Sequence, residues 1–130
     1  MSFEVVIKNL PYLLEGLKVT AQLAGISIVL SFFLGLLLGM ARVSKNRLIR
    51  IPALLYIEIV RGTPLIMVIF WVFFLTPILV GHPIQPFTSA VTAFTVFTSA
   101  YIAEIVRAGI QSIPGGQVEA ALASGLNYWQ

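Results

Sequence analysis

The sequence predicts an all-α membrane protein with about three transmembrane helices, and three observations lead to that class. The chain of 130 residues is 58% hydrophobic and only 10% charged, with a mean hydropathy of +0.97, whereas soluble domains carry about 25% charged residues. Its uncharged stretches reach the length at which a helix crosses a bilayer, roughly 20 residues. Its basic residues gather between those stretches, which is typical of a membrane-topology signal.

Composition also narrows the classes of function. The chain has no cysteine, so a disulfide framework and a thiolate metal site are excluded. No catalytic dyad or metal-ligand spacing is present, which disfavours a soluble enzyme, and we expect neither a metal nor a cofactor. The net charge of +3 would suit nucleic acid, but the placement of the basic residues favours a lipid membrane, and no nucleic-acid partner is expected. The length fits a single domain over residues 1–130.

The first membrane span is expected at residues 19–41, which carry no charge and lie between Lys18 and Arg42. This stretch is too long for a secretory signal and lacks a basic leader, so it is interpreted as a retained span. The segment before it, "SFEVVIKNLPYLLEGLK", mixes apolar and charged residues. We expect an interfacial helix there.

The second span is expected at about residues 54–76, with its helix beginning near Pro52, because proline suits a first helical turn. Pro64 should kink or break this span near its inner end, since it leaves a carbonyl without its helical partner. The following "VGHPIQPF" contains two prolines and a glycine and therefore predicts a loop, in which His82 is expected to be solvated. The third span is expected at about residues 87–107.

The basic residues also predict an orientation. The loop after the first span carries four of them and no acidic residue, and these are Arg42, Lys45, Arg47 and Arg50. The loop after the second span carries none. Because cytoplasmic loops collect positive charge, we expect the loop at 42–50 in the cytoplasm. The N-terminus and the "GHPIQP" loop are then outside, and everything after Arg107 is cytoplasmic.

The tetrapeptide Glu-Ile-Val-Arg occurs twice, at 58–61 and at 104–107, and both copies are expected near the inner membrane surface. Within each copy the acidic and basic residues are three apart, so they are neighbours on a helix. Two interpretations stay open: local pairs that end a helix at the membrane edge, or a polar cluster between helices at the cytoplasmic mouth of a pathway. The residues concerned are Glu58, Arg61, Glu104 and Arg107.

Two helix faces carry small or hydroxyl side chains. In the first span a small residue recurs every fourth position and includes a Gly-x-x-x-Gly, at Ser27, Ser31, Gly35 and Gly39. Small residues let helices approach closely in lipid, so a helix–helix contact is expected there. In the third span one face carries Thr88, Thr92, Thr95 and Ser99. These hydroxyls either bond to their own backbone or line a polar path.

After Arg107 the chain reads "AGIQSIPGGQVEAALASGLNYWQ". The Pro-Gly-Gly at 114–116 predicts a turn, and "QVEAALAS" predicts a short helix that ends at Gly125. A helix of this length is not stable alone. It is either an ordinary connector or an exposed helix that docks into a groove of a partner.

These residues resemble a known family. "EAALASG" is similar to the EAA loop of permease subunits of bacterial binding-protein-dependent ABC importers, in which Glu-Ala-Ala is followed by three residues and Gly. The matching positions are Glu119, Ala120, Ala121 and Gly125. "LPYLLEGLKVTAQL", "VRGTPLIMVIFW" and "AYIAEIVRAGIQSIPGGQ" resemble the polar amino-acid uptake branch of that family, so the likeness covers nearly the whole chain.

The resemblance implies a permease subunit of an ATP-driven amino-acid importer in the bacterial inner membrane, paired with a copy of itself or a paralogue. The EAA loop, at about 114–130, would form a coupling helix held in a cleft of a cytoplasmic ATP-binding subunit, and an external solute-binding protein would deliver the amino acid. The chain has no G-x-x-x-x-G-K-[S/T] loop, so the partner subunit is expected to hydrolyse ATP.

Family members continue past the EAA loop, usually with two further spans, so a truncated product or a fragment is expected here. A second hypothesis remains open, in which the chain is a small structural or ion-conducting membrane subunit unrelated to ABC transport. Its Glu–Arg pairs and small-residue face would then serve assembly.

Overall fold

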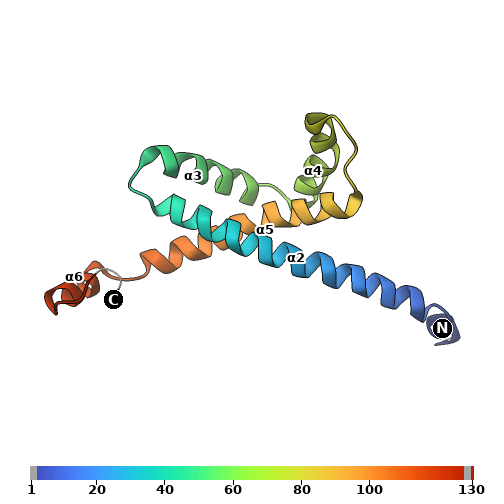
Figure 1. The fold of residues 1–130 in the computed structure, drawn as a ribbon, viewed down its shortest axis with the longest axis horizontal. Coiled ribbons are helices and arrows are strands. Elements are labelled where there is room, and N and C mark those ends of the chain that lie inside the picture. The colour runs from blue at the N-terminus through green and yellow to red at the C-terminus, as the bar shows by residue number, and fades with distance from the viewer. Residues whose placement is uncertain (1–2, 128–129) are drawn as a thin grey trace.

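The computed structural model describes residues 3–127 and 130, and every regular element in this part of the chain is an α-helix (Figure 1). The helices are α1 (Phe3–Lys8), α2 (Leu10–Val43), α3 (Arg47–Arg61), α4 (Leu65–Val80), α5 (Pro86–Gln111) and α6 (Gly115–Ala123). The all-α class predicted from the sequence is confirmed. Two helices, α2 and α5, are each long and apolar enough to cross a membrane, and α3 with α4 qualify together as a bent pair.

The helix α2 begins at Leu10, well before the predicted start of the first span at residue 19. Pro11 lies in its first turn, where a missing N–H costs no helical hydrogen bond. No proline follows within α2, so the helix runs on without a break to Val43. The expected interfacial segment is therefore divided: only α1 is separate from the span, and residues 10–18 continue into it.

The segment expected as the second span, at about 54–76, forms two helices, α3 and α4, whose axes differ by 110°. The break lies at 62–64, as Pro64 predicts, because proline has no N–H to continue the ladder of hydrogen bonds. The side chain of Asn46 accepts a hydrogen bond from the Leu48 N–H at 2.9 Å and fixes an earlier start for α3. Pro52 consequently lies inside α3 and not at its beginning.

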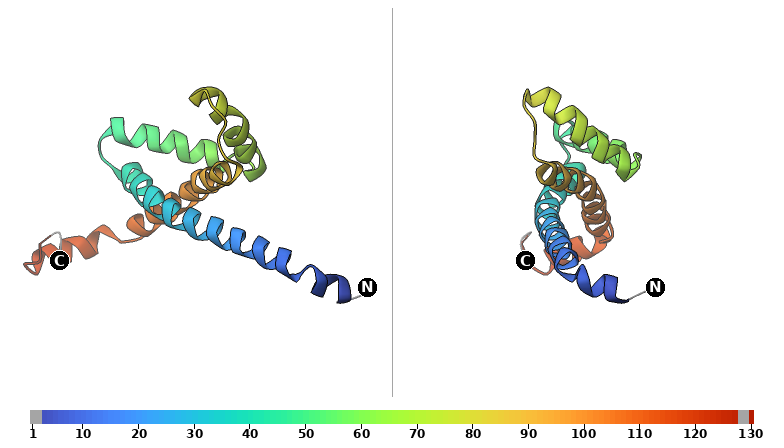
Figure 2. Two further views of the ribbon diagram at one scale, coloured as in Figure 1. Left: turned by 45° about the vertical axis from the view of Figure 1, so that its right-hand side comes forward. Right: turned by 90° about the vertical axis from the view of Figure 1, so that its right-hand side faces the viewer.

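The helices α2 and α5 form the centre of the molecule, with α3 and α4 on one side of the pair (Figures 1 and 2). Gly35 faces Ile102, and Gly39 faces Val106. The residue numbers rise together along the two helices, so α2 and α5 run parallel. The N-terminus and α6 consequently lie at opposite ends of the molecule, as Figure 1 shows.

Small side chains dominate the buried core, and most large apolar side chains are exposed. The buried hydrophobic residues are Ala53, Ile57, Val60, Val68, Val91, Ala93, Ala100 and Ala103. In water such exposure would be unfavourable. In lipid it costs little, and close backbone approach between helices supplies the packing energy instead.

Candidate functional site

The crossing of α2 and α5 determines which side chains meet at the candidate site. The buried residues of α2 are those of the small-residue face, namely Ser27, Ser31, Gly35 and Gly39. A Cβ on Gly35 would lie 2.6 Å from Ile102 Cβ, and one on Gly39 would lie 2.7 Å from Val106 Cβ. Only glycine at these two positions allows α2 and α5 to approach so closely. The close approach brings Arg42, one turn beyond Gly39, beside α5.

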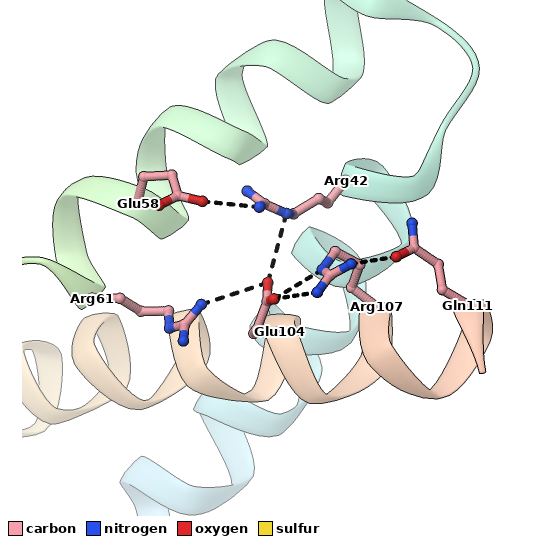
Figure 3. Close-up of polar contacts among 6 residues, drawn as sticks. All are labelled: Arg42, Glu58, Arg61, Glu104, Arg107 and Gln111. Carbon is pink, nitrogen blue, oxygen red and sulfur yellow. Dashed lines mark hydrogen bonds and ion pairs between the residues drawn. The ribbon is translucent and has the colours of Figure 1, made fainter.

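Glu104 of α5 is the centre of a cluster of charges that Figure 3 shows. Its Oε1 accepts hydrogen bonds from Arg107 Nε at 2.9 Å and from Arg107 Nη2 at 2.5 Å. Its Oε2 lies 3.6 Å from Arg42 Nε and 3.7 Å from Arg61 Nη1. One carboxylate therefore contacts arginines from α2, α3 and α5.

The cluster extends from Glu104 to a more exposed rim. Arg42 Nη2 also donates to Glu58 Oε1 at 2.9 Å, and Arg107 Nη1 donates to the side-chain oxygen of Gln111. The side chain of Arg42 is only 14% exposed and that of Glu104 is 21% exposed, whereas that of Glu58 is 58% exposed. Three arginines face two glutamates, so the cluster carries a net charge of +1.

The structure thus brings together all four charged residues of the repeated tetrapeptide. Glu104 and Arg107 form the local pair that their spacing allows. Glu58 and Arg61 instead bond to other helices, through Arg42 and Glu104 respectively. The geometry is that of a polar cluster between helices, and only one of the two copies contains its own ion pair.

Sequence reasoning used Arg42 only to orient the chain and missed it as a member of the cluster. A usable signal was present, because Arg42 follows Gly39 by three positions and so lies on the small-residue face of α2. This face packs against the third span. A basic residue at the C-terminal end of this face therefore lies close to Glu104.

Tyr56 of α3 is a second contact that the sequence did not reveal. Its hydroxyl lies 2.9 Å from the Val96 carbonyl and 2.9 Å from Ser99 Oγ, both on α5. Tyr101 precedes the other tetrapeptide by one residue more, and its ring lies under the Arg61 guanidinium, with 5.6 Å between the ring centroid and Arg61 Cζ. Both tyrosines thus join α3 to α5.

The hydroxyl residues of the third span do not open on one common surface. Thr92 is exposed and donates to the Thr88 carbonyl at 2.8 Å, and Ser99 is buried and donates to the Val96 carbonyl at 2.9 Å. These are the local backbone bonds that such residues often make. The hydroxyl of Thr95 is buried and has no hydrogen-bond partner among the described residues.

The helix α6 carries Glu119, Ala120 and Ala121, and Gly125 ends it as the sequence predicts. Gly125 has φ +82°, its N–H donates to the Leu122 carbonyl at 3.0 Å, and the N–H of Leu126 donates to the Ala121 carbonyl at 3.1 Å. This is the Schellman arrangement, which needs a residue that tolerates a left-handed conformation. Tyr128 and Trp129, which belong to the predicted loop at 114–130, lie outside the described residues.

The short helix α6 stands clear of the rest of the molecule (Figures 1 and 2). None of its residues is buried, and Glu119 has no ion pair within the described part of the chain. Val118 and Leu122, one turn apart, are 44% and 54% exposed. Only residues 112–114 separate α6 from α5, so it is closely connected to the helix that carries Glu104.

Two long apolar helices, a broken pair between them and an exposed helix beyond a charged cluster define a multispan membrane protein. Among the described residues no group of His, Asp or Glu is placed to hold a metal ion. The chain belongs to the family described as the binding-protein-dependent transport system inner membrane component, which matches residues 31–130. It is therefore an integral membrane protein and a permease component, and the hypothesis of a subunit unrelated to ABC transport is rejected.

Several relatives of the chain are named as permease proteins of amino-acid transporters. The chain is 42% identical over 123 residues to the probable glutamine ABC transporter permease protein GlnP of Bacillus subtilis, with 95% of this chain and 56% of the relative covered. It is 38% identical over 128 residues to the arginine transport system permease protein ArtQ of the same organism, covering 98% and 58%. The chain thus spans little more than half the length of these relatives.

A solved structure supports the fold. It is described as the crystal structure of an amino acid ABC transporter with histidines, and it matches with a TM-score of 0.88 and 34% sequence identity. The match covers 98% of this chain and 59% of that chain. The arrangement of helices described above is therefore one that this family adopts.

Proposed function

We propose that the chain acts as the membrane permease subunit of an ATP-driven amino-acid importer, forming part of the translocation pathway. One observation carries the proposal most directly: the Glu-Ala-Ala…Gly pattern forms an exposed, capped helix beyond the charged end of the bundle. ATP hydrolysis belongs to a separate cytoplasmic subunit that α6 contacts. A solute-binding protein delivers the amino acid from outside, and a second permease subunit completes the pathway.

The parallel course of α2 and α5 supports the proposed topology. Two successive helices that cross a bilayer in the same direction require a segment between them that crosses back. If α3 and α4 formed a re-entrant loop, the chain would return to the side it left, and α2 and α5 would be antiparallel. In the proposed topology the bent pair is a broken span, and broken helices occur in membranes where the irregular backbone is enclosed by protein or lines a cavity.

The positive-inside rule then gives the direction. The turn between α2 and α3, with Lys45, and the first turn of α3, with Arg47 and Arg50, lie in the cytoplasm. The N-terminus and the loop around His82 are outside, and α6 is cytoplasmic. This assignment places the charged cluster at the cytoplasmic ends of α2 and α5.

We further propose that the charged cluster acts as a cytoplasmic gate. Its contacts differ in length: Arg107 and Glu104 are hydrogen-bonded within α5, as are Arg42 and Glu58 between α2 and α3. The contacts of Glu104 with Arg42 and Arg61, at 3.6 and 3.7 Å, are longer than hydrogen bonds. A pull on α6 acts first on the end of α5, so these longer contacts between helices separate first.

The experiment exchanges Glu119 and Gly125 for alanine in the chain co-expressed with its ATP-binding subunit and solute-binding protein. Co-purification of the ATP-binding subunit and uptake of labelled amino acid are measured together. Both should fall by at least tenfold, whereas Gln117→Ala, on the same exposed helix but outside the pattern, should retain both. Unchanged co-purification and uptake in the Glu119 and Gly125 variants would remove the coupling role.

A further inference from the structure

The turn between α2 and α3 and the first turn of α3 carry three cations that no carboxylate of the described residues neutralises. Arg42, Arg61 and Arg107 each form an ion pair in the cluster. Lys45, Arg47 and Arg50 are instead exposed, and within residues 3–127 and 130 they form no ion pair. These three cations, together with Leu48, are called the turn surface below.

The helix α3 presents three different faces. One packs in the core through Ala53, Ile57 and Val60. A second is polar and carries Arg47, Arg50, Glu58 and Arg61, at positions that share one side of a helix. The third is apolar and exposed, with Leu48, Ile51, Leu55 and Ile59 at intervals of three and four residues, each at least 49% exposed.

The turn surface combines this apolar face with unneutralised charge. Leu48 is 84% exposed, the joint highest exposure of any large apolar side chain described in the molecule, and it lies between Arg47 and Arg50 in sequence. A helix with basic residues on one face and apolar residues on another is typical of a membrane interface. The exposed cations and the exposed apolar side chains together fit the surface of a membrane, where the headgroup layer is anionic and the acyl-chain layer beneath it is apolar.

The position of the cations on α3 adds a second indication. Arg47 and Arg50 lie in the first turn, which contains no acidic residue. The N-terminal end of a helix carries partial positive charge and favours anions. The arrangement is unfavourable within the chain itself, and an external anion bound between these side chains would relieve it.

We propose that the turn surface binds the phosphate headgroups of anionic phospholipids in the cytoplasmic leaflet. The guanidinium groups of Arg47 and Arg50 and the ammonium of Lys45 contact phosphate oxygens, which guanidinium matches in a bidentate geometry. Leu48 inserts among the adjacent acyl chains. Binding of the headgroups holds the N-terminal end of α3 at the bilayer surface, and α3 carries two members of the charged cluster.

The assignment to the cytoplasmic leaflet depends on the orientation given under the proposed function, whereas the preference for anionic lipid does not depend on it. The lipid preference is therefore tested separately from transport. The purified full chain is titrated in detergent with phosphatidylglycerol or phosphatidylcholine, and bound lipids are counted by native mass spectrometry. The variant K45Q/R47Q/R50Q is compared with K8Q/K18Q, which removes from the other end of the chain two exposed lysines that form no ion pair with any described residue.

The expected result is a preference for phosphatidylglycerol that falls about fivefold for each cation removed from the turn surface, since each contributes a similar attraction to an anionic surface. K8Q/K18Q should keep the preference, and K45R/R47K/R50K should restore most of it. Raising the salt concentration should weaken binding of the anionic lipid alone.

Equal binding of the two lipids by the unaltered chain would overturn the proposal. It would also be overturned if K45Q/R47Q/R50Q and K8Q/K18Q lost the preference for phosphatidylglycerol to the same extent. A third outcome would also overturn it: unchanged lipid preference in K45Q/R47Q/R50Q with loss of the co-purifying ATP-binding subunit. The turn surface would then contact the partner protein. The variant K45Q/R47Q/R50Q should retain the thermal unfolding midpoint of the unaltered chain, because the three side chains that it changes are exposed. The variant L48Q keeps all three charges and therefore tests the apolar contact independently.

Discussion

The two copies of Glu-Ile-Val-Arg, at 58–61 in α3 and at 104–107 in α5, have the same sequence and the same helical conformation but different partners. In α5 the glutamate and the arginine of one copy bond to each other. In α3 they do not: Glu58 bonds to Arg42, and Arg61 contacts Glu104. The spacing permits a local pair, and neighbouring helices decide whether it forms.

The difference follows from the position of the two helices. α5 packs against both α2 and α3, so an arginine from each of these helices reaches Glu104, whose side chain is 21% exposed. α3 lies to one side of the α2–α5 pair, and the side chain of Glu58 is 58% exposed with one ion-pair partner among the described residues. The central carboxylate should therefore contribute much more to stability than the peripheral one.

The largest effect is expected for Glu104→Gln, which removes the charge that three arginines share. Loss of one partner from a fully buried charge pair costs about 3–5 kcal/mol, and the partial exposure here reduces the expected loss to about 2–3 kcal/mol. The loss of stability is measured as a fall in the thermal unfolding midpoint of the detergent-solubilised protein. A loss no greater than that caused by Glu58→Gln would contradict the asymmetry.

The next effect tests the packing that brings Arg42 to α5. Gly35→Ala places a Cβ 2.6 Å from Ile102 and 2.9 Å from the Ser99 carbonyl, and such overpacking costs about 1–3 kcal/mol. Gly25→Ala is the matched control, because nothing lies within 4 Å of its added Cβ and alanine is the better helix former. Equal stability of the two variants would mean that α2 and α5 do not approach as closely as described.

A smaller effect is expected where α3 is held to α5 by a neutral hydrogen bond. Tyr56→Phe removes the hydroxyl that contacts Val96 and Ser99, at a cost of about 1 kcal/mol. Tyr101→Phe should change stability little, because within the described residues its hydroxyl makes no hydrogen bond. Comparing the unfolding midpoints of the two variants checks the contact, and a reversed order would refute it.

The smallest effect is expected for Glu58→Gln. An exposed ion pair contributes about 1 kcal/mol or less, so the stability should fall only slightly. A double-mutant cycle with Arg42→Gln isolates the interaction between the two side chains. A coupling energy above about 2 kcal/mol would show that the outer copy matters as much as the central one.

Features governed by local rules could be predicted from the sequence. Pro64 breaks the second span because it lacks an N–H, and Gly125 ends α6 because it adopts a left-handed conformation. The spacing of Gly35 and Gly39 indicated a packed face, which the structure places against α5. Each of these signals depends on one residue or on one helix.

Features that depend on two or more helices could not be predicted. The 110° bend between α3 and α4 is set by how each packs on α5 and not by Pro64 alone. The partners of Glu58 and Arg61 depend on where α2 ends in space, and the contact of Tyr56 joins residues 40 and 43 positions apart. Periodicity in a single helix carries no such information.

The central claim is that the charged cluster and α6 lie on the cytoplasmic side, and single-cysteine accessibility tests it most directly. The chain has no native cysteine, so His82→Cys and Gln117→Cys each introduce one thiol. A membrane-impermeant maleimide applied to intact cells should label position 82, and it should label position 117 only after the cells are permeabilised. Labelling of position 117 in intact cells, with position 82 protected, would contradict the account.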